Sequence, residues 1–166
     1  ASLGPNHPNV ATDLNNLAAL LQATNRLAEA ELLMRRALAI REKALGPDHP
    51  DVATSLNNLA GLYNEQGRYA DAEPLYKRSV AIWEKILGPD HPDVANVLKT
   101  LAAIEQDRGR YAEAETLFRR ALAIQEKALG PEHPNVATSL DNLAALYAAQ
   151  NQYGQAEVLY TWALMI

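Results

Sequence analysis

The sequence is dominated by an eight-residue motif that returns at a fixed interval. The motif starts at Leu3, Leu45, Leu87 and Leu129, and it reads LGPNHPNV, LGPDHPDV, LGPDHPDV and LGPEHPNV. These four starts are evenly spaced, without insertion or deletion. A fixed period of this length predicts stacked structural repeats, because one repeat cannot bury its apolar surface alone. We therefore expect a single array over residues 1–166, with repeats at about 3–44, 45–86, 87–128 and 129–166.

The ends of the sequence fall inside the repeat pattern. The chain opens within the motif, and the last repeat is shorter than the others. We expect the chain to be a piece of a longer protein, with further repeats on either side.

Each repeat contains two segments with helical periodicity. In the second repeat, Val52, Leu56, Leu59, Ala60 and Tyr63 recur at i, i+4, i+7, i+8 and i+11, which places them on one face of a helix. The other repeats follow the same plan, and no segment has the alternation of a strand. The pattern predicts an all-α chain with helices near 8–24, 27–45, 50–67, 92–108, 111–129, 134–150 and 153–166. One more helix follows Gly67 and runs to about Leu87.

The motif contains the signals that end one helix and begin the next. Gly88 is predicted to adopt the left-handed conformation that closes a helix, and Pro89 prevents its continuation. The second proline suits the first position of the next helix, with Asp48 or His49 as the N-cap in the second repeat. Pro74 is the only proline outside the motif, and we expect it in the first turn of its helix, where a missing N–H costs little.

Composition limits the class of partner. Hydrophobic residues make up 48% of the chain and charged residues 21%, which is ample for a folded core, and the formal net charge is -5. An acidic chain is a poor match for a nucleic-acid backbone, so we expect no nucleic-acid ligand. No apolar run is long enough to span a membrane. The chain has no cysteine, which excludes disulfides, fits a reducing compartment and leads us to expect a cytoplasmic protein.

The residues that could carry chemistry are spread evenly over the repeats. Each repeat has one motif histidine, at His7, His49, His91 and His133. Stacked repeats would arrange these side chains in a widely spaced row, whereas a metal site needs several ligands around one ion. We expect the histidines to cap or pack at helix starts, and we predict no catalytic site, no metal site and no cofactor.

The pattern of small and large residues within each repeat resembles the tetratricopeptide repeat. The fourth repeat has Leu140, Leu143-Ala144, Tyr147, Ala156 and Tyr160 at the family's positions. The third has Glu105 in place of the aromatic residue. The family's ordinary repeat is shorter than the period found here. The longer form, with LNNLA and GPDHPDV, is similar to the kinesin light chain type. The resemblance implies a right-handed α–α superhelical solenoid of four helix-turn-helix repeats.

The resemblance also implies where a ligand binds. In the tetratricopeptide family the first helix of each repeat lines a concave groove, and asparagines there hold the main chain of a peptide. A short amide offers both a donor and an acceptor for that purpose. The predicted groove residues are Asn15, Asn16, Thr54, Asn57, Asn58, Asn96, Lys99, Thr100, Asp141 and Asn142, together with Thr12 and Thr138. Asn16, Asn58 and Asn142 are the favoured peptide contacts.

Alternatives remain for this set. The Asn and Thr side chains could instead solvate an exposed face or bond between neighbouring repeats. The predicted groove carries the positive charge of Lys99 and the negative charges of Glu65, Asp107 and Asp141. Because these charges are mixed, a strongly acidic peptide is not the first choice of ligand.

Two tryptophans break the repetition and are candidates for an interface. Trp83 replaces the Arg41 and Gln125 of other repeats, and Trp162 replaces an arginine on the predicted polar face. A large aromatic residue on a surface can anchor a partner. For Trp83 local packing is favoured, and for Trp162 partner contact and an end-of-array role remain open.

Two functions follow from these observations. The first is a protein-binding scaffold whose concave groove holds a peptide or helix of an unidentified partner. The second is a structural module that associates end to end through apolar terminal repeats, since arrays usually need polar capping helices.

Overall fold

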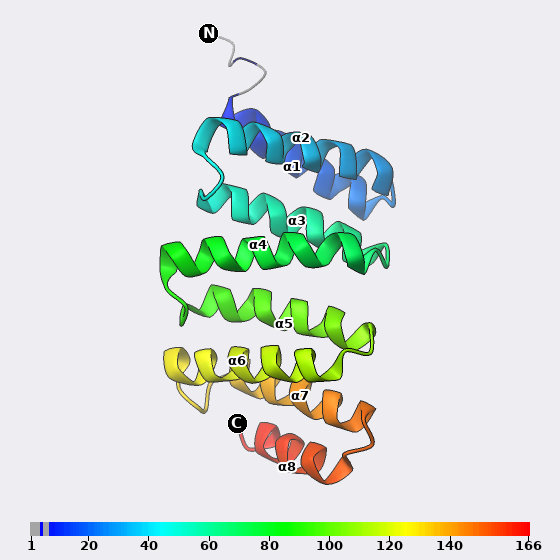
Figure 1. The fold of residues 1–166 in the computed structure, drawn as a ribbon, viewed down its shortest axis with the longest axis vertical. Helices are drawn as coiled ribbons and strands as arrows, with labels where there is room; N and C mark the ends of the chain where they lie inside the picture. Colours follow the sequence, from blue (N-terminus) through cyan, green and yellow to red (C-terminus); the bar gives the residue numbers. More distant parts are fainter. Residues whose placement is uncertain (1–3, 5–6) are drawn as a thin grey trace. The chain divides into compact units, whose positions relative to one another are not determined.

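The computed structural model describes Gly4 and residues 7–166, and all regular structure in this part of the chain is α-helical. The helices are α1 (Pro8–Ala23), α2 (Leu27–Leu45), α3 (Pro50–Glu65), α4 (Tyr69–Leu87), α5 (Pro92–Asp107), α6 (Tyr111–Leu129), α7 (Pro134–Ala149) and α8 (Tyr153–Leu164) (Figure 1). Each repeat is thus one helical hairpin, with a shorter first helix and, in the first three repeats, a longer second helix. The predicted all-α repeat architecture is confirmed, with helix ends within about two residues of those expected.

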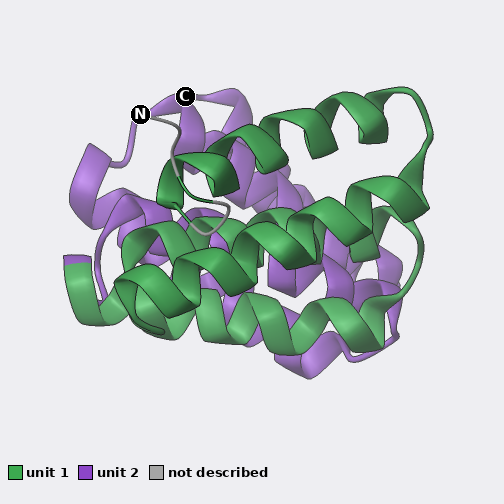
Figure 2. Ribbon diagram, turned by 90° about the horizontal axis from the view of Figure 1, so that it is seen from above, with its two compact units in different colours: residues 1–86 green, residues 87–166 purple. Residues whose placement is uncertain are grey.

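The chain divides into two compact units. Unit 1 is Ala1–Ile86 and unit 2 is Leu87–Ile166, so the boundary falls where the third repeat begins (Figure 2). In unit 1, α1 packs against α2 and α2 packs against α3. In unit 2, α5 packs against α6, α6 against α7, and α7 against α8. The same hairpin-on-hairpin packing therefore occurs once within each unit.

The motif histidines are the N-caps of the four first helices, as predicted. In each case Nδ1 accepts a hydrogen bond from the backbone N–H two residues later. The donors are Asn9 (3.2 Å), Asp51 (3.1 Å), Asp93 (3.2 Å) and Asn135 (3.1 Å). The proline after each histidine is the first residue of its helix, where its missing N–H would have no helical acceptor.

The motif glycines end the second helices, and their positive φ explains why glycine is needed. Gly46, Gly88 and Gly130 have φ of 91°, 93° and 88°. At Gly46 and Gly130, ψ is 160° and 154°, so these two residues leave the helix in an extended conformation with positive φ. Almost no other residue adopts this conformation. The predicted glycine stop is confirmed, although at these two positions ψ lies outside the left-handed helical well.

Pro74 does not lie where we expected it. It is the sixth residue of α4, inside the helix rather than in its first turn. At this position an ordinary residue would donate its N–H to the carbonyl of Ala70, and proline cannot. The helix starts where the sequence predicted, just after Gly67, but its sixth residue already lies beyond the first turn, so the N–H that Pro74 lacks would have had a helical acceptor.

The buried cores consist of the positions that carry the family pattern. In unit 2, Phe118, Leu143, Ala144 and Tyr147 form one cluster with neighbouring alanines. The small residues have almost no exposed surface, which allows the helices to approach closely. Glu105, which replaces the aromatic residue of the third repeat, is 3% exposed and forms an ion pair with Arg110.

Among the described residues, no helix is long and apolar enough to cross a membrane.

Candidate functional site

The first helices carry most of the predicted binding residues on exposed or half-exposed positions. The exposed ones are Thr12, Asn16, Thr54, Asn58, Asn96, Thr138 and Asp141, and the half-buried ones are Asn15, Asn57, Lys99, Thr100 and Asn142. We call this set the first-helix face. It recurs at equivalent positions of each repeat because the period contains no insertion.

The threonines of the first-helix face use their hydroxyl hydrogens within their own helices. The hydroxyl of Thr54 donates to the carbonyl of Pro50 at 3.2 Å, and that of Thr138 to Pro134 at 3.2 Å. Thr100 donates to the carbonyl of Asn96 at 3.3 Å. These three hydroxyls are therefore left mainly as acceptors for a ligand.

Three asparagines of the same face keep their full hydrogen-bonding capacity. Within the part of the chain that the structure describes, the side-chain amides of Asn16, Asn58 and Asn142 make no hydrogen bond to other residues. Their polar atoms are also absent from the buried unsatisfied groups of the described residues. These amides are accordingly available both as donors and as acceptors.

A network of polar side chains joins the two repeats of unit 1 beside this face. Arg41 is 7% exposed, and its Nη1 donates to the carbonyl of Asp51 at 3.0 Å and to the hydroxyl of Ser55 at 2.9 Å. Its Nη2 donates to the hydroxyl of Thr12 at 3.2 Å, and Asn15 donates to Ser55 at 3.5 Å. Asn15 and Thr12 thus take part in packing between repeats, which was one of the alternatives that the sequence left open.

Unit 2 builds the equivalent network from different residues. Gln125 occupies the position of Arg41, and the amide orientation that satisfies its neighbours donates to the carbonyl of Asn135 at 2.9 Å and contacts Ser139. Its oxygen then accepts a hydrogen bond from Nζ of Lys99 at 3.1 Å. Burial lowers the pKa of Lys99, since removing an ammonium group from water disfavours its charged form.

The two tryptophans have different environments. Trp83 is half-buried and packs against Val52, Ala53, Leu56 and Ile82, so local packing, the favoured interpretation, is what the structure shows. Trp162 lies on α8 and is 41% exposed. Its surface is accessible to a partner, and its role as an interface residue stays a prediction.

No group of three or more His, Asp or Glu residues in the described part of the chain is arranged to hold a metal ion. The four capping histidines have their Nδ1 atoms engaged with backbone N–H groups.

Sequence reasoning missed a recurring cluster of polar side chains that joins a second helix to the first helix of the next repeat. In unit 1 the hydroxyl of Tyr63 donates to Glu31 at 2.9 Å, and Arg35 donates to the same carboxylate at 2.9 Å. In unit 2 the corresponding bonds join Tyr147 to Glu115 at 2.7 Å and Arg119 to Glu115 at 2.8 Å. The available signal was the recurrence of the same Glu, Arg and Tyr two periods further along the chain.

The two clusters shift the pKa values of equivalent residues alike: the glutamate pKa is lowered and the tyrosine pKa is raised in both units. Burial opposes ionisation of Glu31, but hydrogen bonds from Arg68, Tyr63 and Arg35 hold its pKa below the usual value. Burial, followed by the hydrogen bond to Glu31, raises the pKa of Tyr63. In both units the second-helix arginine is fixed by a carboxylate and lies over the tyrosine ring, with its guanidinium carbon 5.8 Å (unit 1) and 5.9 Å (unit 2) from the ring centroid.

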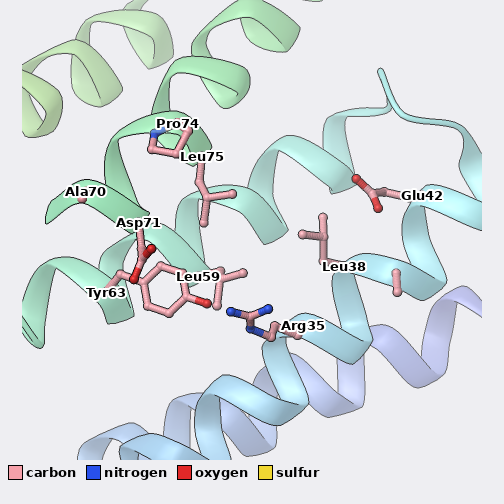
Figure 3. A pocket seen from close by; sticks show the side chains of 10 residues that line it. Arg35, Leu38, Glu42, Leu59, Tyr63, Ala70, Asp71, Pro74 and Leu75 are labelled. Carbon is pink, nitrogen blue, oxygen red and sulfur yellow. The ribbon is translucent and has the colours of Figure 1, made fainter. Parts of the chain in front are cut away.

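Each cluster borders an open pocket between two second helices. In unit 1 the cavity volume is about 390 Å³, and the leucines of its floor come from α2, α3 and α4. Arg35 lies beside Tyr63 and Leu59 at this pocket (Figure 3). The complete lining is Arg35, Leu38, Ala39, Glu42, Leu59, Tyr63, Ala70, Asp71, Pro74 and Leu75. None of these residues belongs to the first-helix face.

Comparison with known proteins agrees with this architecture. Family models of the tetratricopeptide repeat match residues 10–51, 33–82, 51–126 and 94–166. Comparison with curated protein sequences finds no match.

Solved structures of similar repeats cover nearly the whole chain. One such structure is a putative kinesin light chain from Podosopora anserina, whose own TPR-like repeats are nearly identical to one another. It is 32% identical in sequence to this chain, with a TM-score of 0.87, and the match covers 99% of this chain and 78% of that chain. BtubC (BKLC) from P. vanneervenii is 25% identical, also with a TM-score of 0.87, and covers 96% of this chain. The chain spans 64% of the length of that BtubC structure. The apo form of RapI is 17% identical with a TM-score of 0.78, a likeness of fold alone.

The family matches extend over most of the sequence, and the related structures have the same helical-repeat solenoid fold. The Leu-Gly-Pro motif recurs at the extended period throughout the sequence. The chain therefore belongs to the tetratricopeptide repeat family, as an array of the kinesin light chain-like type.

Proposed function

We propose that the first-helix face binds a peptide segment of a partner protein, through hydrogen bonds from Asn16, Asn58 and Asn142 to the ligand main chain. The family is one of protein-interaction scaffolds, which makes a protein or peptide the expected class of ligand. The observation that carries the proposal is that these three amides share one position in three repeats and are free of in-chain hydrogen bonds among the described residues. The amides of Asn57 and Asn96 are free of such bonds too, whereas Asn15 and three threonines are engaged.

The equivalent position of the third repeat is Thr100, so three of four repeats present an asparagine at the same place. A peptide main chain offers alternating N–H and C=O groups, and each asparagine can bond one of each. Contacts of this kind give affinity without selecting a sequence, so the differing residues Lys99 and Asp141 would supply selectivity.

The test replaces Asn16, Asn58 and Asn142 together by alanine. Partners are first captured from a native lysate with the unaltered chain, and their affinities are then measured by titration calorimetry for both forms. Loss of at least one hydrogen bond of about 1 kcal/mol at each of the three residues predicts a loss of affinity of roughly 100-fold or more. A control variant with alanine at Arg36 and Glu113, on exposed positions of second helices, should bind normally. Unchanged affinity of every captured partner for the triple variant would refute the groove assignment.

A second candidate function, end-to-end association of this chain, is favoured by a specific contrast in burial. Leu17 and Leu20 on α1 are 47% and 62% exposed, whereas their counterparts Leu59 and Leu62 on α3 are 3% and 0% exposed. Tyr160 on α8 is 40% exposed, whereas its counterpart Phe118 is 3% exposed. The two exposed faces have the chemistry of the two halves of a repeat-to-repeat contact, so a second copy could supply what each lacks.

Light scattering over a range of concentrations tests this second candidate. Association of the chain that is abolished by Leu20→Glu and kept by Thr116→Glu would support it. A monomer at the highest concentration would refute it.

A further inference from the structure

The second-helix side of unit 2 contains a pocket with the same plan as the pocket of unit 1. It has a cavity volume of about 280 Å³ and is lined by Arg119, Leu143, Tyr147, Gly154, Gln155, Val158 and Leu159. Every one of these residues stands two periods after a residue that lines the pocket of unit 1. The pocket is therefore a repeated product of the fold, formed by two successive second helices over the buried side of a first helix.

The two pockets differ in charge. In unit 1 the lining combines Arg35 with two carboxylates, Glu42 and Asp71. In unit 2 the position of Asp71 is taken by Gln155, and Arg119 is the one charged residue among the described residues that line the pocket. The apolar floor is kept, so the pocket of unit 2 combines aliphatic surface with a single positive charge.

Arg119 is held in place before any ligand arrives. Its Nε donates to Glu115 at 2.8 Å and its Nη2 donates to the hydroxyl of Tyr147 at 2.5 Å. Its side chain is still 58% exposed, and its Nη1 has no in-chain acceptor among the described residues. A fixed guanidinium group with free donors binds a carboxylate at a small entropic cost.

Gly154 provides the space at the mouth of the pocket. A Cβ added at Gly154 would meet no atom within 4 Å, and its counterpart in unit 1 is Ala70. Unit 2 therefore lacks the methyl group that Ala70 places in the lining of the unit 1 pocket.

We propose that the pocket between α6 and α8 is a second protein-binding site, which takes an aliphatic side chain of a partner segment together with a neighbouring carboxylate that pairs with Arg119. This site is separate from the first-helix face. The pocket of unit 1 should take the same segment more weakly, because the carboxylates of Glu42 and Asp71 line it, even though Glu42 is paired with Arg78 and Asp71 with Arg68.

The test uses the dipeptide N-acetyl-Leu-Glu-amide as a probe in two-dimensional amide NMR of the isotope-labelled chain. We expect saturable shifts at Gly154, Gln155 and Val158 at millimolar concentrations. N-acetyl-Leu-Gln-amide, which lacks the charge, should bind about threefold or more weakly, the effect of an exposed ion pair.

Three variants separate the pocket from the rest of the molecule. Gly154→Leu should abolish the shifts by filling the pocket that Gly154 lines, and the fold should be kept because an added Cβ meets no atom within 4 Å. Gln155→Asp, which restores the carboxylate of unit 1, should weaken binding of the Leu-Glu probe and leave binding of the Leu-Gln probe unchanged. Ala70→Leu, the matched change in unit 1, should leave the shifts of unit 2 unaltered.

Equal affinity of the two probes would overturn the assignment of a carboxylate partner. Unaltered shifts in Gly154→Leu, or shifts confined to Asp141 and Asn142 on the first-helix face, would overturn the assignment of the pocket.

Discussion

At the scale of single residues, the side chains that attract attention as chemical groups have structural tasks. The histidines of the motif accept hydrogen bonds from the first turn of each first helix. The Glu31 carboxylate accepts hydrogen bonds from Tyr63, Arg35 and Arg68 and so links α2 to α3 and to the start of α4. Both tasks can be measured.

Replacing the capping histidine should cost the stability that one cap supplies. His49→Ala should lower the free energy of unfolding by about 0.5–2 kcal/mol, because the N–H of Asp51 loses its acceptor. His49→Asn, which keeps a cap acceptor, should retain most of the stability. Urea unfolding followed by far-UV circular dichroism measures both, and an equal loss in the two variants would contradict the capping role.

Removing Glu31 should change how stability depends on pH. Its folded-state pKa is lowered, so the carboxylate contributes stability above its unfolded pKa of about 4.5, and that contribution is lost as pH falls through the lower folded value. Glu31→Ala should therefore lower the free energy of unfolding by about 1 kcal/mol at neutral pH, allowing for partial exposure. The difference from the unaltered chain should disappear in strong acid. Glu29→Ala, at an exposed carboxylate that pairs with Arg26, should have little effect at any pH.

At the scale of helices, the motif sets where each element begins and ends. The histidine-proline pair starts a first helix, and the glycine with positive φ ends a second helix. Gly154 shows the opposite case, since it lies inside α8 with space around it and no requirement for positive φ.

These two glycines should respond to alanine in opposite ways. Gly130→Ala should lower the free energy of unfolding by about 1–3 kcal/mol, because φ of 88° with ψ of 154° strains any residue with a Cβ. Gly154→Ala should raise it by about 0.5–1 kcal/mol through higher helix propensity. Thermal unfolding of the two variants beside the parent checks both signs, and a loss of stability in Gly154→Ala would show that the space at that residue is needed for the fold.

The helices could be predicted from the sequence because their ends depend on local residues. The hydrogen bonds of the candidate site were harder to predict, because they depend on contacts between elements. Pro, Gly and His at fixed spacing give the helix ends to within about two residues. The hydroxyl bond of Thr54 and the cross-repeat bond of Asn15 depend on side-chain torsions that spacing does not determine. The pocket of unit 2 depends on which residues of α6 and α8 meet over α7, and no stretch of sequence contains that information by itself.

At the scale of the whole molecule, each unit has buried clusters of its own. Phe118 and its neighbours fill unit 2, and Val52, Leu56 and Ile82 form a cluster in unit 1. In repeat proteins stability is close to a sum of terms within repeats and between neighbours, so damage should remain local.

A large-to-small change in one unit should loosen that unit first. Phe118→Ala should cost about 3–5 kcal/mol and should speed amide hydrogen exchange in α6 and α7 more than in α1 and α2. Met34→Ala, two periods earlier in unit 1 and also 3% exposed, should show the reverse distribution. Equal loss of protection along the chain in both variants would mean that the array unfolds as one cooperative body.

The unvarying linker has a consequence for how such a chain can change over generations. The first helix of every repeat has a histidine N-cap and begins with proline. The described second helices that precede a linker end at a glycine with positive φ. Unequal recombination between any two copies of its coding sequence would add or remove one whole repeat and leave every junction intact. The number of repeats can therefore vary freely, whereas the residues exposed on each helix hairpin are inherited as a block.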